Sequence, residues 1–202
     1  LRLIFEVLGN RGLLDNALPV ITADHGEEFF EHGGKGHRRT LFEEMIRVPL
    51  IVHWPGRVRS DTVIENQVRL IDIMPTLAAA AGLEPGPAIQ GRDLAPFLQG
   101  SSLPPARSLS ELFVDGNSLR ALRSENRKLL QRDETVPGWL YDLDADPGEM
   151  RPVVTEEVAG PVQAEVAKAL ELRARLGLDG SDPVELEDDL RERLEALGYL
   201  DN

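Results

Sequence analysis

Cysteine is absent from the 202 residues, and aromatic side chains are scarce at 5%. Without cysteine the chain can form no disulfide, no thiolate zinc site and no cysteine nucleophile. No apolar run approaches the roughly 18 residues of a membrane-spanning helix, so the sequence predicts no membrane span. The chain does not begin with methionine, so the lack of a signal peptide carries no information about its compartment.

Basic side chains are too few to balance the acidic ones, and the formal net charge at pH 7 is −13. The excess lies mainly in residues 141–202, which hold 17 acidic and 6 basic side chains, whereas residues 1–60 hold 8 of each. A nucleic-acid-binding protein needs a basic face, and the sequence predicts none, so we expect no nucleic-acid partner. All four histidines lie in the first 53 residues. This neutral first quarter is therefore where we expect the chemistry.

The first half of the sequence alternates between helical and strand patterns. The expected elements are helices over 1–14, 40–46 and 70–81 and buried strands over 17–23 and 48–54. Asp72 is expected to cap the third helix, which Gly82 ends. This order favours an α/β domain with a largely parallel sheet.

After Pro105 the pattern changes to short strands. Four strand candidates fall between 108 and 143 at intervals of 8–12 residues, which favours an antiparallel meander. Trp139 and Tyr141 are expected in its core. Helical periodicity follows over 158–176 and 183–197. We therefore expect two domains, 1–105 and 106–202, the second with strands in 108–143 and helices in 156–198.

An Asp-His-Gly-Glu segment at 24–27 directly follows the first predicted strand. Asp24 and His25 offer an anionic oxygen and a neutral nitrogen, and both can reach one ion only if the chain turns, which Gly26 permits. The alternative is that Asp24 caps the next element of the chain and His25 is an ordinary loop residue. Glu27 and Glu28 are interpreted as surface acids, with support of His25 as a lesser alternative.

Each of the three remaining histidines has a different interpretation. His32 is expected to belong to the loop scaffold. His53 lies in a buried-strand pattern and is expected to be a core histidine with satisfied hydrogen bonds. His37 gains its interpretation from the motifs around it.

The motifs occur in an order that resembles the sulfatase family of the alkaline-phosphatase-like superfamily. Asp-His-Gly-Glu is followed by Glu-His-Gly, Gly-His, Thr-Leu-Phe-Glu-Glu, Arg-Val-Pro-Leu-Ile-Val and Trp-Pro-Gly, all within 24–56. Further matches are Leu-Ile-Asp-Ile-Met-Pro-Thr-Leu at 70–77, Gln-Gly-Arg-Asp-Leu at 90–94, and Leu-Tyr-Asp-Leu followed by Asp-Pro-Gly-Glu within 140–149. Each motif is weak alone, but their order across nearly the whole chain is specific.

The resemblance implies a fold and roles for individual residues. The fold would be part of an α/β/α sandwich followed by a small C-terminal antiparallel sheet with helices. Asp24 and His25 resemble metal ligands, and Asp-His rather than Asp-Asn is closer to the phosphonate-ester hydrolase branch. His37 resembles the cation that contacts the sulfate or the leaving-group oxygen, and Lys35 is the alternative for that role. Calcium is the first metal expected, with manganese or zinc favoured by the nitrogen of His25.

The resemblance covers the second half of a sulfatase only. A formylglycine nucleophile, made from a Cys or Ser motif, and an Asp-Asp metal pair would lie in a missing N-terminal half. We therefore expect the full-length enzyme to hydrolyse an organic sulfate ester, carried by a small molecule or a carbohydrate. The isolated chain, with two metal ligands at most, is expected to bind metal weakly and to have no turnover. The alternatives are a phosphonate or phosphate ester hydrolase of the same superfamily, and a non-catalytic pseudoenzyme or partner domain.

Overall fold

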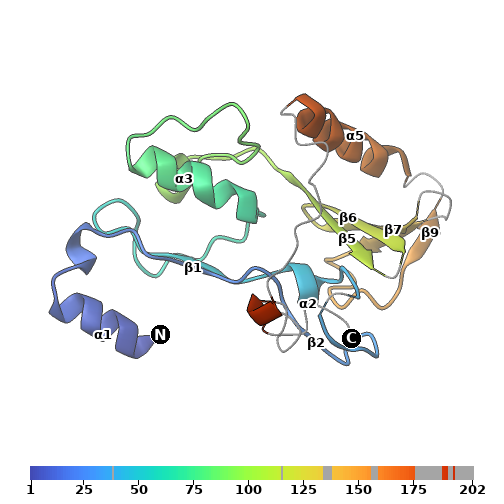
Figure 1. Ribbon diagram of the computed structural model, residues 1–202, viewed down its shortest axis with the longest axis horizontal. Coiled ribbons are helices and arrows are strands. Elements are labelled where there is room, and N and C mark those ends of the chain that lie inside the picture. Colours follow the sequence, from blue (N-terminus) through green and yellow to red (C-terminus); the bar gives the residue numbers. More distant parts are fainter. Residues whose placement is uncertain are drawn as a thin grey trace. The chain divides into compact units, whose positions relative to one another are not determined.

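The computed structural model describes residues 1–37, 39–114, 116–133, 138–155, 159–175, 188–190 and 193 (Figure 1). The chain divides into two compact units, residues 1–166 and residues 167–202. Helix α5 (Ala159–Arg175) matches the helix expected over 158–176. The helix expected over 183–197 lies almost wholly outside the described residues. The domain boundary expected between residues 105 and 106 stays a prediction.

Strands β1 (Val20–Thr22) and β4 (Leu50–Val52) form a two-stranded ribbon. They pair antiparallel, with Ile21 opposite Ile51, so the expectation of a largely parallel sheet is wrong for this pair. The reason lies in the connection. Parallel strands need a crossover that packs back onto the sheet, usually a helix. The segment between β1 and β4 instead contains a hairpin and the one-turn helix α2 (Glu43–Ile46), which packs on other strands.

Helices α3 (Ile73–Ala80) and α4 (Ala95–Leu98) cover one face of the ribbon, and α1 (Arg2–Asn10) precedes it. The facing apolar side chains enclose a small gap lined by Leu18, Val20, Leu50, Val52, Ile73, Leu77, Leu94 and Leu98. Neither strand is buried, and the Ile51 side chain is 53% exposed. The expectation of buried strands is therefore wrong for the described chain, because the helices cover the ribbon from one side only.

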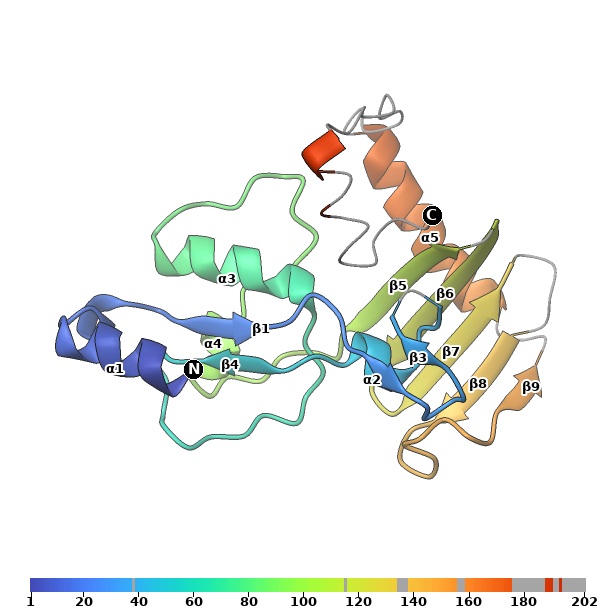
Figure 2. The ribbon, with the colours of Figure 1, turned by 60° about the horizontal axis from the view of Figure 1, so that its bottom comes forward.

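A five-stranded antiparallel sheet follows in the order β5-β6-β7-β8-β9 (Figure 2). Its strands are Arg107–Val114, Asn117–Ser124, Arg127–Arg132, Gly138–Asp142 and Val153–Thr155. The first four confirm the predicted meander. The fifth was not predicted, because three residues are too few to show the alternation by which a strand is recognised.

Both faces of this sheet are covered. On one face, Ala121, Leu130 and Tyr141 form a core with Leu41 and Phe42, which flank α2. On the other face, Leu122 and Leu129 pack against Val166 of α5. Successive strand residues point to opposite faces, so the apolar pair 121–122 supplies one side chain to each core. The prediction that Trp139 and Tyr141 belong to the core of this sheet is confirmed.

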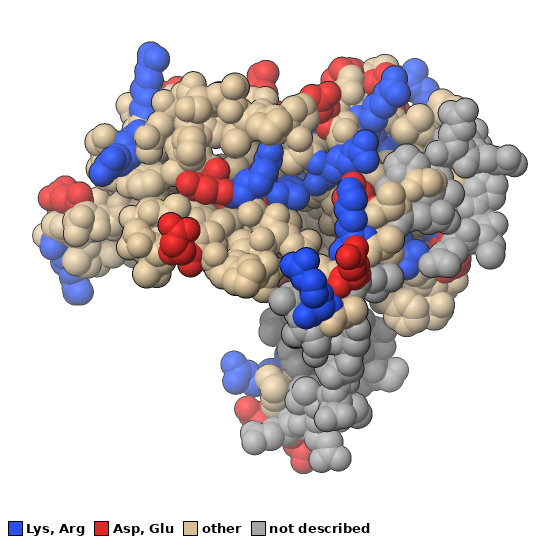
Figure 3. Space-filling model, turned by 90° about the horizontal axis from the view of Figure 1, so that it is seen from above, with Lys and Arg blue, Asp and Glu red and all other residues tan. Residues whose placement is uncertain are grey.

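Within the described ranges, no helix combines the length and the apolar character that a bilayer crossing requires. The face shown in Figure 3 carries both acidic and basic side chains, with a short run of basic ones across its middle.

Candidate active site

The Asp-His-Gly segment is fixed to α2 by its backbone. Gly26 N–H donates to the carbonyl of Met45 at 2.8 Å, and Glu27 N–H donates to that of Glu44 at 3.1 Å. A Cβ on Gly26 would lie 1.8 Å from the Glu44 carbonyl oxygen, so only glycine allows this approach. The turn predicted at Gly26 is therefore present, and it leads the chain from β1 past the end of α2.

This turn brings the side chains of Asp24 and His25 near each other. Asp24 Oδ2 lies 3.9 Å from His25 Nε2, and Asp24 Oδ1 accepts the His25 backbone N–H at 3.0 Å. His25 Nδ1 lies 2.7 Å from the Gly26 carbonyl oxygen, which can only accept, so Nδ1 carries the hydrogen. A neutral His25 therefore presents the lone pair of Nε2 on the side of Asp24. This is the tautomer that a metal ligand of this type needs.

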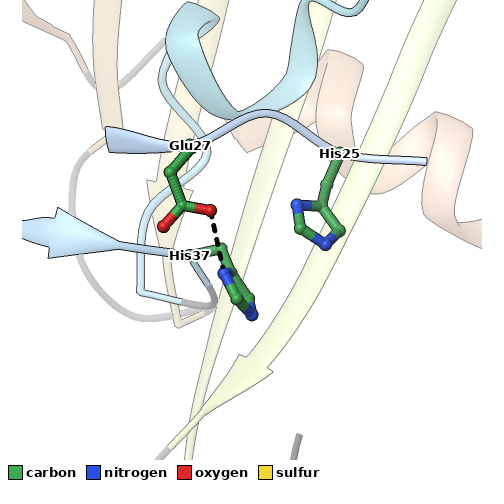
Figure 4. A group of neighbouring side chains, drawn as sticks. All are labelled: His25, Glu27 and His37. Atoms are coloured by element: carbon green, nitrogen blue, oxygen red, sulfur yellow. Dashed lines mark hydrogen bonds and ion pairs between the residues drawn. The ribbon is translucent and has the colours of Figure 1, made fainter. Parts of the chain in front are cut away.

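A short hairpin brings His37 to the same place. Strands β2 (Glu28–Phe29) and β3 (Lys35–Gly36) pair antiparallel with Glu28 opposite Gly36, so the next pair outward is Glu27 and His37. Glu27 Oε2 lies 3.1 Å from His37 Nδ1, and the His37 ring stacks on the His25 ring with centroids 4.6 Å apart (Figure 4). One donor atom each of His25, Glu27 and His37 lie within 4.8 Å of one another.

Glu27 was interpreted as a surface acid, with support of His25 as the lesser alternative, and the structure instead places its carboxylate against His37. Its neighbour Glu28 is not a surface acid, and for that residue the interpretation is wrong. Glu28 is buried, and its carboxylate accepts N–H groups from Gly34 at 2.7 Å and His32 at 3.2 Å. A buried carboxylate needs such donors to offset its lost hydration, so Glu28 holds the loop between β2 and β3 closed.

His32 has the scaffold role that was predicted for it. Its Nδ1 lies 2.7 Å from Glu44 Oε1, its ring stacks on Phe42, and Nε2 lies 3.3 Å from the Glu149 carbonyl oxygen. Lys35 is exposed, opposite Phe29 in the hairpin, and makes no ion pair with any residue that the structure describes. The hairpin thus brings His37, rather than Lys35, onto His25.

Two other predictions are corrected. His53 is exposed rather than in the core, because it follows the uncovered end of β4. Asp72 is at the N-cap position of α3, but its side chain makes no bond to that helix. Its fully buried carboxylate instead accepts the Arg69 guanidinium at 2.7 Å and the Arg92 backbone N–H at 2.8 Å. Burial of a charge demands such close cationic and N–H partners.

A buried ionic network ties α2 to the five-stranded sheet. Lys128, fully buried on β7, lies 2.8 Å from Glu149 and 3.4 Å from Glu43. Glu149 also accepts the Glu43 backbone N–H at 2.6 Å, and Arg123 lies 3.2 Å from Glu43. Burial raises the pKa of Glu149, although Lys128 acts against that shift. Burial, with the nearby charge of Glu149, raises the pKa of Tyr141 to about 12.

The donor set around the Asp-His turn fits a divalent cation. Two carboxylates and two imidazoles lie on one stretch of 14 residues, and the His25 tautomer leaves Nε2 as the ligand atom. Hard oxygen donors suit calcium and magnesium, whereas imidazole suits manganese and zinc better. Among the described residues, His25, Glu27 and His37 form the group whose donor atoms lie within reach of one ion, and Asp24 lies beside His25 without joining that group.

Comparison with known families decides the assignment. The model of a family described as "N-sulphoglucosamine sulphohydrolase, C-terminal" matches residues 31–175. The chain belongs to this sulfatase family. An N-acetylglucosamine-6-O-sulfatase of Bacteroides thetaiotaomicron is 29% identical over 91% of the chain and 34% of its own length. Steryl-sulfatase of Mus musculus is 30% identical over 85% of the chain and 34% of its own length. The chain thus spans about a third of these sulfatases.

Solved structures share the fold. One is a protein in complex with its substrate D-glucosamine-2-N,6-O-disulfate, 26% identical, with a TM-score of 0.66 over 91% of this chain and 39% of that one. Another is a phosphonate monoester hydrolase from Silicibacter pomeroyi, 28% identical, with a TM-score of 0.67 over 85% of this chain and 37% of that one. The sulfatase fold class expected from the motif order is confirmed.

Proposed function

We propose that the full-length protein containing these residues hydrolyses the sulfate ester of a carbohydrate. The observation that carries this proposal is the stacked pair of His25 and His37, each ring oriented by an acceptor, next to Asp24 and Glu27. Support for a sulfated sugar comes from the similarity to an N-acetylglucosamine-6-O-sulfatase and to a protein solved with a disulfated glucosamine.

Hydrolysis of a sulfate ester breaks the bond between sulfur and the bridging oxygen. Overall, the oxygen of water is added to sulfur to give sulfate, and a proton is added to the bridging oxygen to give the alcohol. The difficulty is negative charge that builds on the leaving oxygen. In the proposed mechanism His37 acts there. Its Nδ1–H points to Glu27, so contact with the substrate is through Nε2. A protonated His37 donates the Nε2 proton to the leaving oxygen, and Glu27 stabilises the imidazolium beforehand.

Asp24 and His25 are proposed as metal ligands on this chain. A bound divalent ion would supply positive charge next to the non-bridging sulfate oxygens. Calcium is our first proposal for its identity, with manganese or zinc as the alternatives that the imidazole of His25 favours. Elemental analysis of the purified full-length protein and of its Asp24→Ala variant tests this assignment. Loss of a stoichiometric metal in the variant supports the ligand, and an unchanged metal content contradicts it.

The nucleophile, which the resemblance implies to be a formylglycine, would come from outside these 202 residues. Lys35 remains the alternative cation for the substrate, although His37 is better placed beside His25. The experiment that tests the function measures turnover of para-nitrophenyl sulfate by the full-length protein and its His37→Ala variant. Loss of one general acid lowers kcat by about 100-fold or more when the leaving group is a poor one such as a sugar hydroxyl, so the same variant is also compared on N-acetylglucosamine 6-sulfate. The exposed His53→Ala variant is the matched control and should retain wild-type turnover.

Phosphonate ester hydrolysis is the second candidate. It is favoured by the Asp24-His25 pair and by structural similarity to two phosphonate monoester hydrolases at 28% and 26% identity. The same preparation is therefore tested on para-nitrophenyl phenylphosphonate. A larger kcat/KM for the phosphonate than for sulfate esters would replace the sulfatase proposal. No turnover of either class by the metal-loaded, full-length protein would favour a pseudoenzyme.

A further inference from the structure

The hairpin that carries His37 has a second residue pair on the same face. In the register of β2 and β3, Phe29 lies opposite Lys35, one pair beyond Glu28 and Gly36. Side chains alternate along a strand, so Phe29 and Lys35 lie on the face of Glu27 and His37, while Glu28 points to the other face. The buried state of Glu28 and the 3.1 Å contact between Glu27 and His37 agree with this alternation.

Within the described residues, other side chains leave most of Phe29 uncovered, and none forms an ion pair with Lys35. Phe29 is 64% exposed, and Lys35 is exposed without an ion pair among the described residues. A single exposed apolar residue is ordinary, but this one is held in place. Directly after it, Phe30 has a φ of 75°, a left-handed conformation that is uncommon for a bulky residue. Two backbone hydrogen bonds close the turn and fix the end of β2. The Phe30 N–H donates to the Gly34 carbonyl at 2.8 Å, and the Gly33 N–H donates to the Phe30 carbonyl at 3.2 Å.

The chemistry of the pair defines what it could bind. An aromatic face offers an apolar platform for the C–H groups of a ring, and an ammonium group binds sulfate or carboxylate. Positions two apart along a strand are separated by roughly 7 Å. A ligand with one anionic group at His37 therefore needs a second negative charge on its organic part to reach Lys35.

We propose that Phe29 and Lys35 form a subsite for the sugar of the substrate, with Lys35 binding a second anionic substituent on it. This inference rests on the proposed sulfatase function, because it assigns the transferred sulfate to His37. It makes the preferred substrate a saccharide that carries at least two negative groups rather than a neutral monosulfated alcohol.

The test measures competitive inhibition of para-nitrophenyl sulfate hydrolysis by the full-length protein. The inhibitors are glucosamine 6-sulfate and D-glucosamine-2-N,6-O-disulfate, and the readout is the ratio of their inhibition constants. An exposed ion pair is worth up to about fivefold in binding. We expect the wild type to prefer the disulfated sugar by about that factor, and Lys35→Met to bring the ratio near one. Phe29→Ala should weaken both sugars together, because they share the ring.

Arg11→Met, which removes an exposed positive charge from another part of the chain, is the control and should keep the wild-type ratio. An unchanged ratio in Lys35→Met overturns the subsite, and an equal loss of affinity for both sugars would place Lys35 on the transferred sulfate instead. Should the protein fail to hydrolyse para-nitrophenyl sulfate, the proposed function fails separately. The ratio of affinities is then measured by calorimetry, which still decides the subsite.

Discussion

The five-stranded sheet and the β1–β4 ribbon differ in how much of their apolar surface is covered. The sheet buries side chains on both faces, with Ala121, Leu130 and Tyr141 at 4% exposure or less. The ribbon has helices on one side and leaves Ile51 more than half exposed. The candidate site lies on the segment between β1 and β4, yet its buried anchors run through α2 to the sheet. The sheet, rather than the ribbon, therefore holds the site in place.

The largest effect is expected from the ionic anchor between α2 and the sheet. Lys128→Met leaves the buried carboxylates of Glu43 and Glu149 without their shared cation. Loss of one member of a buried ionic group costs about 3–5 kcal/mol of unfolding free energy. Denaturant unfolding of the full-length protein measures this cost, with the exposed Arg2→Met as control. A cost below about 1 kcal/mol would show that the network does not anchor the site.

The two regions should also differ in the cost of removing an apolar side chain. Leu130→Ala opens a cavity in the core of the sheet and should cost about 2–5 kcal/mol. Ile51→Ala removes a side chain that is half in water already, and should cost less than about 1 kcal/mol. Denaturant midpoints of the two variants give the comparison directly. Equal costs would mean that Ile51 is covered by other parts of the full-length protein.

Alkaline pH should weaken the sheet through Tyr141. Its pKa is raised from 10 to about 12, so the folded state retains a proton that the unfolded state loses. The contribution of Tyr141 to the unfolding free energy is therefore fully present below pH 10. It is lost as the pH rises towards 12, and the loss is about 2–3 kcal/mol. Tyr141→Phe removes this component of the pH dependence. A variant with the same alkaline slope as the wild type would assign the slope to other groups.

A smaller effect of the same kind is expected from Glu149. Burial raises its pKa, so the folded state binds a proton more readily than the unfolded state. This contribution to stability is present at acid pH and is lost as the pH rises from the ordinary glutamate value through the raised one. Glu149→Gln should therefore flatten the stability profile in that range. A steeper profile in the variant would contradict a raised pKa of Glu149 in the folded state.

The same contrast explains what the sequence could predict. Strands β5 to β8 are each five to eight residues long, which is enough for the sequence to show a strand pattern and the spacing between strands, so they were predictable. The direction of the β1–β4 pair was not, because three residues reveal a strand but not its partner. Asp24 and His25 stand out as an Asp-His pair directly after a predicted strand, and His37 stands out by the sulfatase-like motifs around it. Glu27 does not, because a two-residue strand gives no register, and the register alone decides whether Glu27 or Glu28 faces His37.

In the proposed mechanism, Glu27 and His37 work as one unit beside Asp24 and His25. A double-mutant cycle of Glu27→Gln and His37→Gln, measured as kcat/KM of the full-length protein for para-nitrophenyl sulfate, tests it most directly. Removing the oriented imidazole leaves Glu27 nothing to position, so the double variant should lose no more activity than His37→Gln alone. Additive losses would contradict the account, because the two residues would then act on the substrate independently.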